Sequence, residues 1–232
     1  MARLLVHVEG QTEETFVNEV LRDYLLPKGY WAVEARIVGN ARPRKRRGGI
    51  IPWLSVKEEI VTHLKEDPTC IATTMVDYYA LPQKGEGAWP GSMMATSQMS
   101  GEKAQSVERA LLEDVIVAMG KHFDLRRFVP FVVMHEFEGL LFSDCEAFSR
   151  AIYRPDLEAA LHKIREQFPT PEDINDSPVT APSKRVNELV PEYQKPLLGS
   201  LAATEIGLSR IRQECPHFNE WLKQLENRAR IE

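Results

Sequence analysis

Short apolar segments alternate with amphipathic ones over the first 140 residues of the chain. Residues 3–9 are rich in Leu and Val, and residues 70–76 are equally apolar, so both have the character of buried strands. Residues 31–37 alternate between apolar and polar side chains, as a half-buried strand does, and residues 128–134 form another apolar run. We therefore expect about four strands in this part of the chain.

Apolar side chains recur at helical spacing between these strands, over residues 11–26, 54–66 and 102–119. The alternation of strand and helix argues for an α/β layer fold with a mostly parallel sheet. After residue 140 the pattern is helical throughout, with helices expected at 144–153, 155–167, 183–190, 200–213 and 216–229.

The domain organisation follows from this change of pattern. We expect an α/β domain over residues 1–142 and a helical C-terminal extension over residues 143–232, packed on it.

Charge is distributed unevenly along the 232 residues. The chain has 29 Lys and Arg against 34 Asp and Glu, a net charge of -5, which excludes a generally basic coat for nucleic acid. Five of the positive charges lie within residues 42–47. The chain is therefore an acidic body that carries one basic loop.

The N-terminus and the cysteines predict a soluble cytoplasmic protein. The first nine residues do not have the form of a signal peptide, and no apolar stretch approaches the roughly 18–20 residues needed to span a bilayer. The three cysteines are far apart and form no C-x-x-C pair, so we expect buried, reduced thiols and no membrane partner.

Carboxylates follow three of the four predicted strands, at Glu9, Asp77 and Glu136. Ligands of open α/β sheets bind outside the carboxyl ends of the strands, and acids gathered there need a cation to offset their repulsion. Glu13 lies four residues after Glu9, in the first turn of the following predicted helix, and completes a predicted Mg²⁺ or Mn²⁺ site, with Glu138 and Asp144 as nearby candidates. The alternative is that these acids are simply solvated strand ends.

Several common motifs are missing from the sequence. There is no G-x-x-x-x-G-K-[ST], so the chain is not itself a P-loop ATPase, and no G-x-G-x-x-G follows the first strand. The segment that begins at His135 starts like a zincin helix, but Gly139 stands where the second histidine is required.

The basic loop has two interpretations, a solvated turn or a clamp for the phosphates of nucleic acid. Its charged residues are Arg42, Arg44, Lys45, Arg46 and Arg47. An acidic metal pocket together with such a loop is what a metal-dependent phosphodiesterase needs. Lys184, next to Arg185, is a further candidate for a phosphate contact or for transition-state charge, the alternative being a surface pair at a helix start.

Residues 8–17, Val-Glu-Gly-Gln-Thr-Glu-Glu-Thr-Phe-Val, resemble the opening motif of Toprim-like proteins, especially of overcoming-lysogenization-defect (OLD) nucleases. Further segments are similar to a bacterial Toprim-like family of unknown function, and together the segments span nearly the whole chain. These segments are residues 75–82, 135–142, 174–178, 195–199 and 215–218.

This resemblance implies a Rossmannoid Toprim-like domain that binds Mg²⁺ and cuts DNA or RNA. Glu9 and Glu13 match its first motif and Asp77 its second, while Glu136 and Glu138 stand for the third acidic position. The usual Asp-x-Asp of the second motif ends on Tyr79 here. Whether the site holds one metal or two therefore stays open, with Glu138 or Asp144 as substitutes for the second Asp.

The first functional hypothesis is a Toprim-type nuclease. The residues expected to act in catalysis are Glu9, Asp77, Glu136, Glu138 and Lys184, with Glu138 or His135 orienting the attacking water. The resemblance also implies a partner ATPase of the SMC or ABC type and a role in anti-phage defence, and it leaves a homo-oligomer open. The alternatives are a non-catalytic binding or regulatory subunit that docks on such an ATPase, and a different phosphotransfer or phosphatase activity.

Overall fold

The computed structural model describes residues 1–39, 50–93, 100–174, 177 and 180–229. Its sheet is parallel throughout, with the order β2-β1-β3-β4, and β5 also pairs with β3. The strands are β1 (Ala2–Val8), β2 (Tyr30–Ile37), β3 (Cys70–Asp77), β4 (Phe128–Val129) and β5 (Val132–Val133). The predicted α/β fold with a mostly parallel sheet is confirmed.

The fourth predicted strand is divided into two short ones, β4 and β5, around Pro130. Proline has no amide hydrogen to give to the ladder, so regular pairing stops there. The hydroxyl of Thr74 on β3 bridges the interruption. It donates to the carbonyl of Phe131 (2.8 Å) and accepts from the amide of the same residue (2.9 Å). The sheet therefore stays continuous up to its carboxyl edge.

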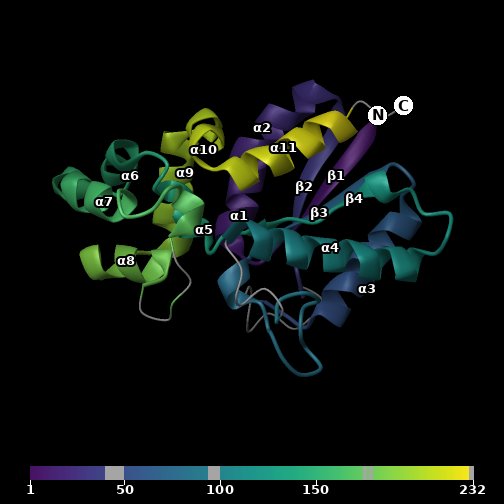
Figure 1. Cartoon of the computed structure of the whole chain (residues 1–232). Helices are drawn as coiled ribbons and strands as arrows, with labels where there is room; N and C mark the ends of the chain where they lie inside the picture. Colours follow the sequence, from purple (N-terminus) through teal and green to yellow (C-terminus); the bar gives the residue numbers. More distant parts are fainter. Residues whose placement is uncertain (40–49, 94–99, 175–176, 178–179, 230–232) are drawn as a thin grey trace.

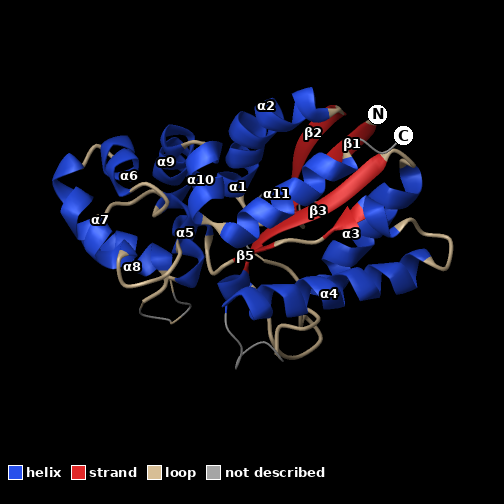
Figure 2. Ribbon diagram, turned by 45° about the horizontal axis from the view of Figure 1, so that its top comes forward, coloured by secondary structure: helices blue, strands red, loops and turns tan. Residues whose placement is uncertain are grey.

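Helices cover both faces of the sheet (Figures 1 and 2). One face packs on two helices. The first is continuous from α1 (Gln11–Phe16) through the π-helical η1 (Val17–Leu21) to α2 (Arg22–Leu25), and the second is α11 (Pro216–Arg228). The other face packs on α3 (Trp53–Glu66) and α4 (Ser100–Met119). The short helices η2 (Leu26–Lys28), η3 (Tyr78–Ala80) and η5 (Leu125–Arg127) complete this part. The result is a three-layer arrangement with one apolar core on each side of the sheet.

The remaining helices gather beside the carboxyl end of the sheet. They are α5 (Phe137–Leu141), α6 (Cys145–Ala151), η6 (Pro155–Leu157), α7 (Glu158–Arg165), η7 (Pro171–Asp173), α8 (Pro182–Leu189), η8 (Lys195–Gly199), α9 (Ser200–Ile206) and α10 (Leu208–Glu214). We call α6 to α10 the helical lobe (Figure 1, left). The single helix predicted at 200–213 is two helices, because Gly207 adopts φ +76°, which a helix cannot accommodate.

The last helix returns from the helical lobe to the sheet. The indole of Trp221 on α11 stacks on Phe131, with ring centroids 4.3 Å apart, and its N–H donates to Thr73 Oγ1 on β3 (2.9 Å). The hydroxyl of Tyr30 on β2 donates to the carbonyl of Leu225 (2.8 Å). The C-terminal helix is therefore part of the sheet's own core, while the domain boundary expected at 142/143 stays a prediction.

Replacing Trp221 by Phe is expected to lower the free energy of unfolding by about 1 kcal/mol, because the buried Thr73 hydroxyl loses a donor. Urea unfolding measures this difference. Trp31→Phe is the matched control, since Trp31 is 56% exposed on β2 and its replacement should change stability by less than about 0.5 kcal/mol. Equal effects of the two substitutions would contradict the packing of α11 on the sheet.

All three cysteines are buried free thiols, as expected. Within the described residues, no helix is both long enough and apolar enough to cross a membrane.

Candidate functional site

Four carboxylates meet at the carboxyl edge of the sheet. Glu9 directly follows β1, Asp77 is the last residue of β3, Glu13 lies in the first turn of α1 and Glu138 in α5. The amide of Asp77 donates to Glu9 Oε2 (3.4 Å). Glu13, Asp77 and Glu138 are almost completely buried, and the charges of all four interact. We call Glu9, Glu13, Asp77 and Glu138 the acidic cluster.

Lys195, the first residue of η8, contacts two carboxylates of this cluster. Lys195 Nζ lies 3.1 Å from Asp77 Oδ2 and 3.0 Å from Glu138 Oε2. Burial lowers the pKa of Lys195, but the charges of Asp77, Glu138 and Glu13 outweigh this effect and raise the pKa above its ordinary value. Lys195 is therefore a fixed ammonium at neutral pH.

The acids hold their protons more tightly than exposed carboxylates do. Burial raises the pKa of Glu9 to about 8, with further contributions from the charges of Asp77 and Glu13. Burial likewise raises the pKa of Glu13 and that of Glu138 to about 7, and the charge of Asp77 adds to both shifts. One lysine therefore does not compensate the negative charge of the cluster, which would be stabilised by a further cation.

Local hydrogen bonds hold the cluster in place. The amide of Phe137, the first residue of α5, donates to Asp77 Oδ1 (2.8 Å). This bond ties the start of α5 to the end of β3 and so brings Glu138 next to Asp77. A close contact adds to this hydrogen bond. Glu13 of α1 lies so near Gly10 that a Cβ added to Gly10 would come within 3.3 Å of Glu13 Oε2. Both contacts depend on the short turns that follow β1 and β5.

Other acidic candidates are bonded to helix starts. Glu136 Oε2 accepts from the amide of Ser183 (2.8 Å) in the first turn of α8, although its charge still acts on Glu138. Asp144 Oδ1 accepts from the amide of Ala147 (2.9 Å) and so caps α6. Glu138 therefore belongs to the acidic cluster, whereas Glu136 and Asp144 do not.

The remaining candidates lie apart from the cluster or outside the described residues. His135 is buried, and its Nδ1 lies 2.9 Å from the carbonyl of Ile174. Lys184 is exposed on α8. The residues of the basic loop, Arg42, Arg44, Lys45, Arg46 and Arg47, lie outside the described residues. Their roles stay predictions.

Lys195 and Tyr193 are the two residues of the site to which the sequence assigned no role. The hydroxyl of Tyr193 is buried and has no hydrogen-bond partner in the described part of the chain, and the charges of Glu138 and Lys195 act on it. Lys195 does belong to one of the segments that carry the Toprim resemblance. Its pairing with Asp77, however, spans 118 residues, and no local pattern predicts a contact over that separation.

The donor chemistry of the acidic cluster fits a hard divalent cation. All of its ligand atoms are carboxylate oxygens, which Mg²⁺ and Mn²⁺ prefer. Oε2 of the fully buried Glu138 pairs with Lys195, but its Oε1 has no hydrogen-bond partner among the described residues. As positioned here, no three His, Cys, Asp or Glu side chains of the described residues converge as ligands of one ion. The acids share the ammonium of Lys195 instead.

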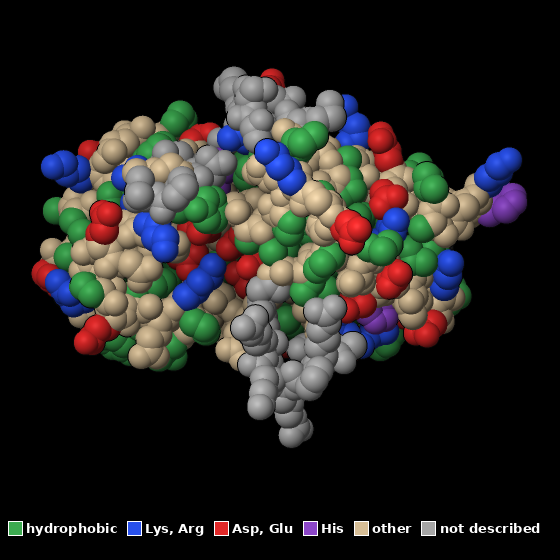
Figure 3. All heavy atoms as spheres, turned by 90° about the horizontal axis from the view of Figure 1, so that it is seen from below, with side chains coloured by type: hydrophobic (Ala, Val, Ile, Leu, Met, Phe, Trp, Pro, Cys, Tyr) green, Lys and Arg blue, Asp and Glu red, His purple; other side chains and the backbone are tan. Residues whose placement is uncertain are grey.

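The surface around this edge of the sheet is hollowed. Seen from below, Asp and Glu side chains gather in a hollow between the helical lobe and the part of the molecule that carries the sheet, with Lys and Arg side chains beside them (Figure 3). Acidic side chains are thus accessible in this hollow, whereas Glu13, Asp77 and Glu138 are themselves almost completely buried.

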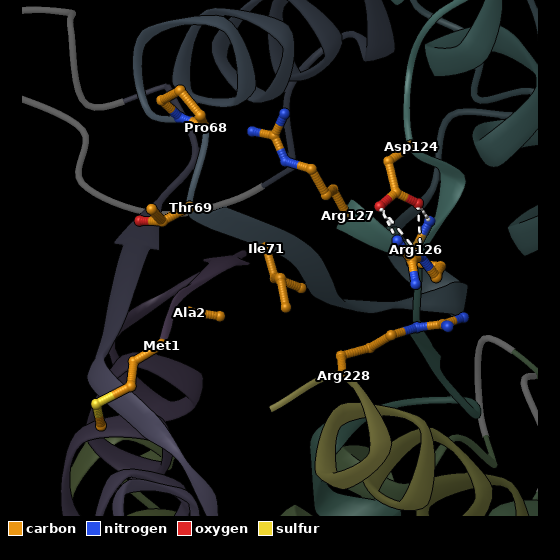
Figure 4. A pocket seen from close by; sticks show the side chains of 9 residues that line it. All are labelled: Met1, Ala2, Pro68, Thr69, Ile71, Asp124, Arg126, Arg127 and Arg228. Atoms are coloured by element: carbon orange, nitrogen blue, oxygen red, sulfur yellow. Dashed lines mark hydrogen bonds and ion pairs between the residues drawn. The ribbon is translucent and has the colours of Figure 1, made fainter. Parts of the chain in front are cut away.

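A separate cavity of about 270 Å³ lies at the opposite end of the sheet, where β1 and β3 begin (Figure 4). Asp124 and Arg126 form a two-pronged ion pair at its wall, with Nε 2.9 Å and Nη2 2.7 Å from the carboxylate oxygens. None of the four acids lines this cavity. It is therefore distinct from the acidic cluster.

The chain was compared with known families, curated proteins and solved structures. A family profile described as a domain of unknown function, DUF4276, matches residues 8–226. No curated protein and no solved structure matches the chain. The matched range contains every residue of the acidic cluster as well as Lys195 and α11 up to Glu226. The chain therefore belongs to the DUF4276 family.

Proposed function

We propose that this protein is a Mg²⁺- or Mn²⁺-dependent nuclease of the Toprim type, which hydrolyses phosphodiester bonds in DNA or RNA. The observation that carries the proposal is the buried acidic cluster at the carboxyl edge of a parallel sheet, with a lysine inside it. Such a cluster is costly to a fold unless a cation offsets its repulsion. The resemblance of residues 8–17 and of the later segments to Toprim-like and OLD proteins supports the same function.

The residues of the site divide into two roles in this proposal. Glu9, Glu13 and Asp77 would hold the divalent ion, which when bound lowers the pKa of water and stabilises negative charge on phosphate. Glu138 or His135 would orient the attacking water. Glu136 keeps its place as a predicted ligand beside the ion, and exposed Lys184 as a predicted phosphate contact.

The wider setting is also part of the proposal. We place the protein in the cytoplasm, with nucleic acid as its substrate and an ATPase of the SMC or ABC type as its partner in anti-phage defence. The support is the resemblance to Toprim-like relatives that are encoded beside such ATPases. The sequence has no Walker motif of its own, which is compatible with an ATPase supplied in trans.

Cleavage assays on the purified chain test the proposal. Single- and double-stranded DNA and RNA are incubated with Mg²⁺, with Mn²⁺ or with EDTA, and small phosphomonoesters and phosphodiesters are run beside them. We expect polynucleotide cleavage that requires the metal. Because a missing ATPase can silence a nuclease, Mn²⁺ binding is measured first by calorimetry. Failure of the chain to bind Mn²⁺, even with nucleic acid present, would contradict the proposal.

A second candidate function is a Toprim-like regulatory subunit that docks on an ATPase and does not cut. It is favoured by Tyr79 at the position of the usual second Asp and by the ammonium of Lys195 between Asp77 and Glu138. Metal-dependent turnover by the isolated chain would exclude this function. Chemistry confined to small phosphoesters would instead indicate a phosphatase.

Neutralising the basic loop is expected to weaken binding of nucleic acid and to flatten its salt dependence. Each phosphate contact that is lost lowers the slope of log K against log salt by about 0.9 on double-stranded DNA. The four residues changed to Gln are Arg44, Lys45, Arg46 and Arg47. Fluorescence anisotropy at several salt concentrations measures the slope.

A second variant with four exposed cations replaced outside the loop controls for net charge. These residues are Arg126, Arg150, Lys163 and Lys223. This control should keep a steeper slope than the loop variant. An unchanged slope in the loop variant would assign residues 42–47 to an ordinary solvated turn.

A further inference from the structure

Lys195 lies between two buried carboxylates and forms an ion pair with each of them. Its Nζ is 3.1 Å from Asp77 Oδ2 and 3.0 Å from Glu138 Oε2. Asp77 Oδ1 already accepts from the amide of Phe137, so both oxygens of this carboxylate are engaged. The pair Asp77 and Glu138 is thus provided with a positive charge by the chain itself.

The other carboxylate oxygens of the acidic cluster are not paired with a cation of the described residues. Glu9 and Glu13 have no Lys, Arg or His within ion-pair distance in the described part of the chain. Glu138 Oε1, at the fully buried end of the cluster, has neither a hydrogen bond nor an ion pair there. Buried oxygens without partners are costly, and they are the groups that a bound cation or its waters would satisfy.

The segment that carries Lys195 is fitted closely against the site. The short helix η8 packs on α1, which carries Glu13, and on α9. At its end, a Cβ on Gly199 would come within 3.0 Å of the Tyr193 hydroxyl and 3.3 Å of Thr12 Cγ2, so only glycine allows this approach without movement. The fold therefore holds the backbone of η8 against the site, and the partly exposed side chain of Lys195 extends from it to Asp77 and Glu138.

We propose that Lys195 is a built-in cation that takes the place of a second metal, so that the acidic cluster binds a single divalent ion on the side of Glu9 and Glu13. The inference rests on the proposed metal dependence and specifies its stoichiometry. Lys195 and one divalent ion set three positive charges against four carboxylates. A second divalent ion would leave an excess of positive charge in a buried site.

Counting bound ions tests this directly. Mn²⁺ is titrated into the full chain and measured by calorimetry and by the electron paramagnetic resonance signal of free Mn²⁺. We expect one ion for the wild type and for Lys195→Arg, which keeps the charge. Lys195→Met, which keeps the length of the side chain and removes the charge, should bind two. Lys223→Met, at an exposed lysine of α11, is the matched control and should bind one.

A double variant guards against a folding defect. Lys195→Met leaves Asp77 and Glu138 without their cation, and the metal-free variant can be unstable for that reason. Lys195→Met combined with Glu138→Gln removes one charge of each sign and should fold and bind one ion. Thermal unfolding with and without Mn²⁺ adds a second measurement. Mn²⁺ should raise the Tm of Lys195→Met more than that of the wild type.

The outcomes separate this inference from the proposed function. A wild type that binds one ion, with Lys195→Met also at one, would overturn the role of Lys195 and leave the metal-dependent nuclease intact. Two ions in the wild type would do the same. A wild type that binds no Mn²⁺ would overturn the proposed function and this inference with it.

Discussion

Replacing Asp77 by Asn is expected to lower Mn²⁺ affinity and any metal-dependent cleavage by more than about 100-fold. Asp77 is the centre of the acidic cluster, since its charge acts on Glu9, Glu13 and Glu138 and its side chain contacts Lys195. Asn is nearly isosteric, and its oxygen can still accept from the amide of Phe137. The substitution therefore removes the charge while it preserves the link between β3 and α5.

The control for Asp77→Asn is Asp124→Asn, which neutralises an acid at the opposite end of the sheet, outside the cluster. Circular dichroism and thermal unfolding establish that both variants fold. The control should bind Mn²⁺ and cleave as the wild type does. If folded Asp77→Asn retains wild-type affinity and rate, the acidic cluster is not the active site.

The strands could be predicted because their signals are local. A parallel strand covered on both faces is a short continuous apolar run, and residues 70–76 needed nothing more to be recognised. The details that the sequence pattern missed depend on single residues. Pro130 divides an apolar run that otherwise has the length of one strand, and Gly207 interrupts a helical periodicity that continues on both sides of it.

Part of the site could be predicted for the same reason. Glu9 follows β1 and Asp77 ends β3, and parallel strands bring their carboxyl ends to one edge, so topology alone places these two acids together. Topology does not decide which of the two acids near β5 turns inward. Glu136 caps α8 through Ser183, so Glu138 enters the cluster instead. That choice depends on a helix that begins more than 40 residues later in the sequence.

Lys195 could not be predicted as a site residue from local sequence patterns. It lies at the start of a short π-helix in a helical region, without periodicity or a catalytic motif to distinguish it. Its importance comes from its position among carboxylates at the edge of the sheet, because their negative charges raise the pKa of Lys195 and outweigh the lowering by burial. Such a contact depends on the tertiary packing of the helical part against the sheet, which local sequence patterns do not specify.

The metal-free protein is expected to lose about 2 kcal/mol of stability between pH 7 and pH 8.5. The pKa of Glu9 is raised to about 8, and those of Glu13 and Glu138 to about 7, above the ordinary 4.5 of a glutamate. The folded chain therefore binds more protons than the unfolded chain in this range, and stability falls as the pH rises. Lys195, whose pKa is raised, stays charged in both states throughout the window and does not contribute to the slope.

Urea unfolding at pH 7 and pH 8.5, in EDTA and in excess Mn²⁺, measures this loss. Glu9→Gln should flatten the slope, because it removes the group that titrates nearest pH 8, whereas Glu220→Gln, at an exposed acid of α11, should not. In Mn²⁺, stability should instead rise with pH, because the ion binds deprotonated carboxylates and a higher pH deprotonates more of them. Stability that is constant over this range in EDTA would mean that the acids are not buried together. A slope in EDTA that Mn²⁺ leaves unchanged would mean that the cluster is real but is not a metal site.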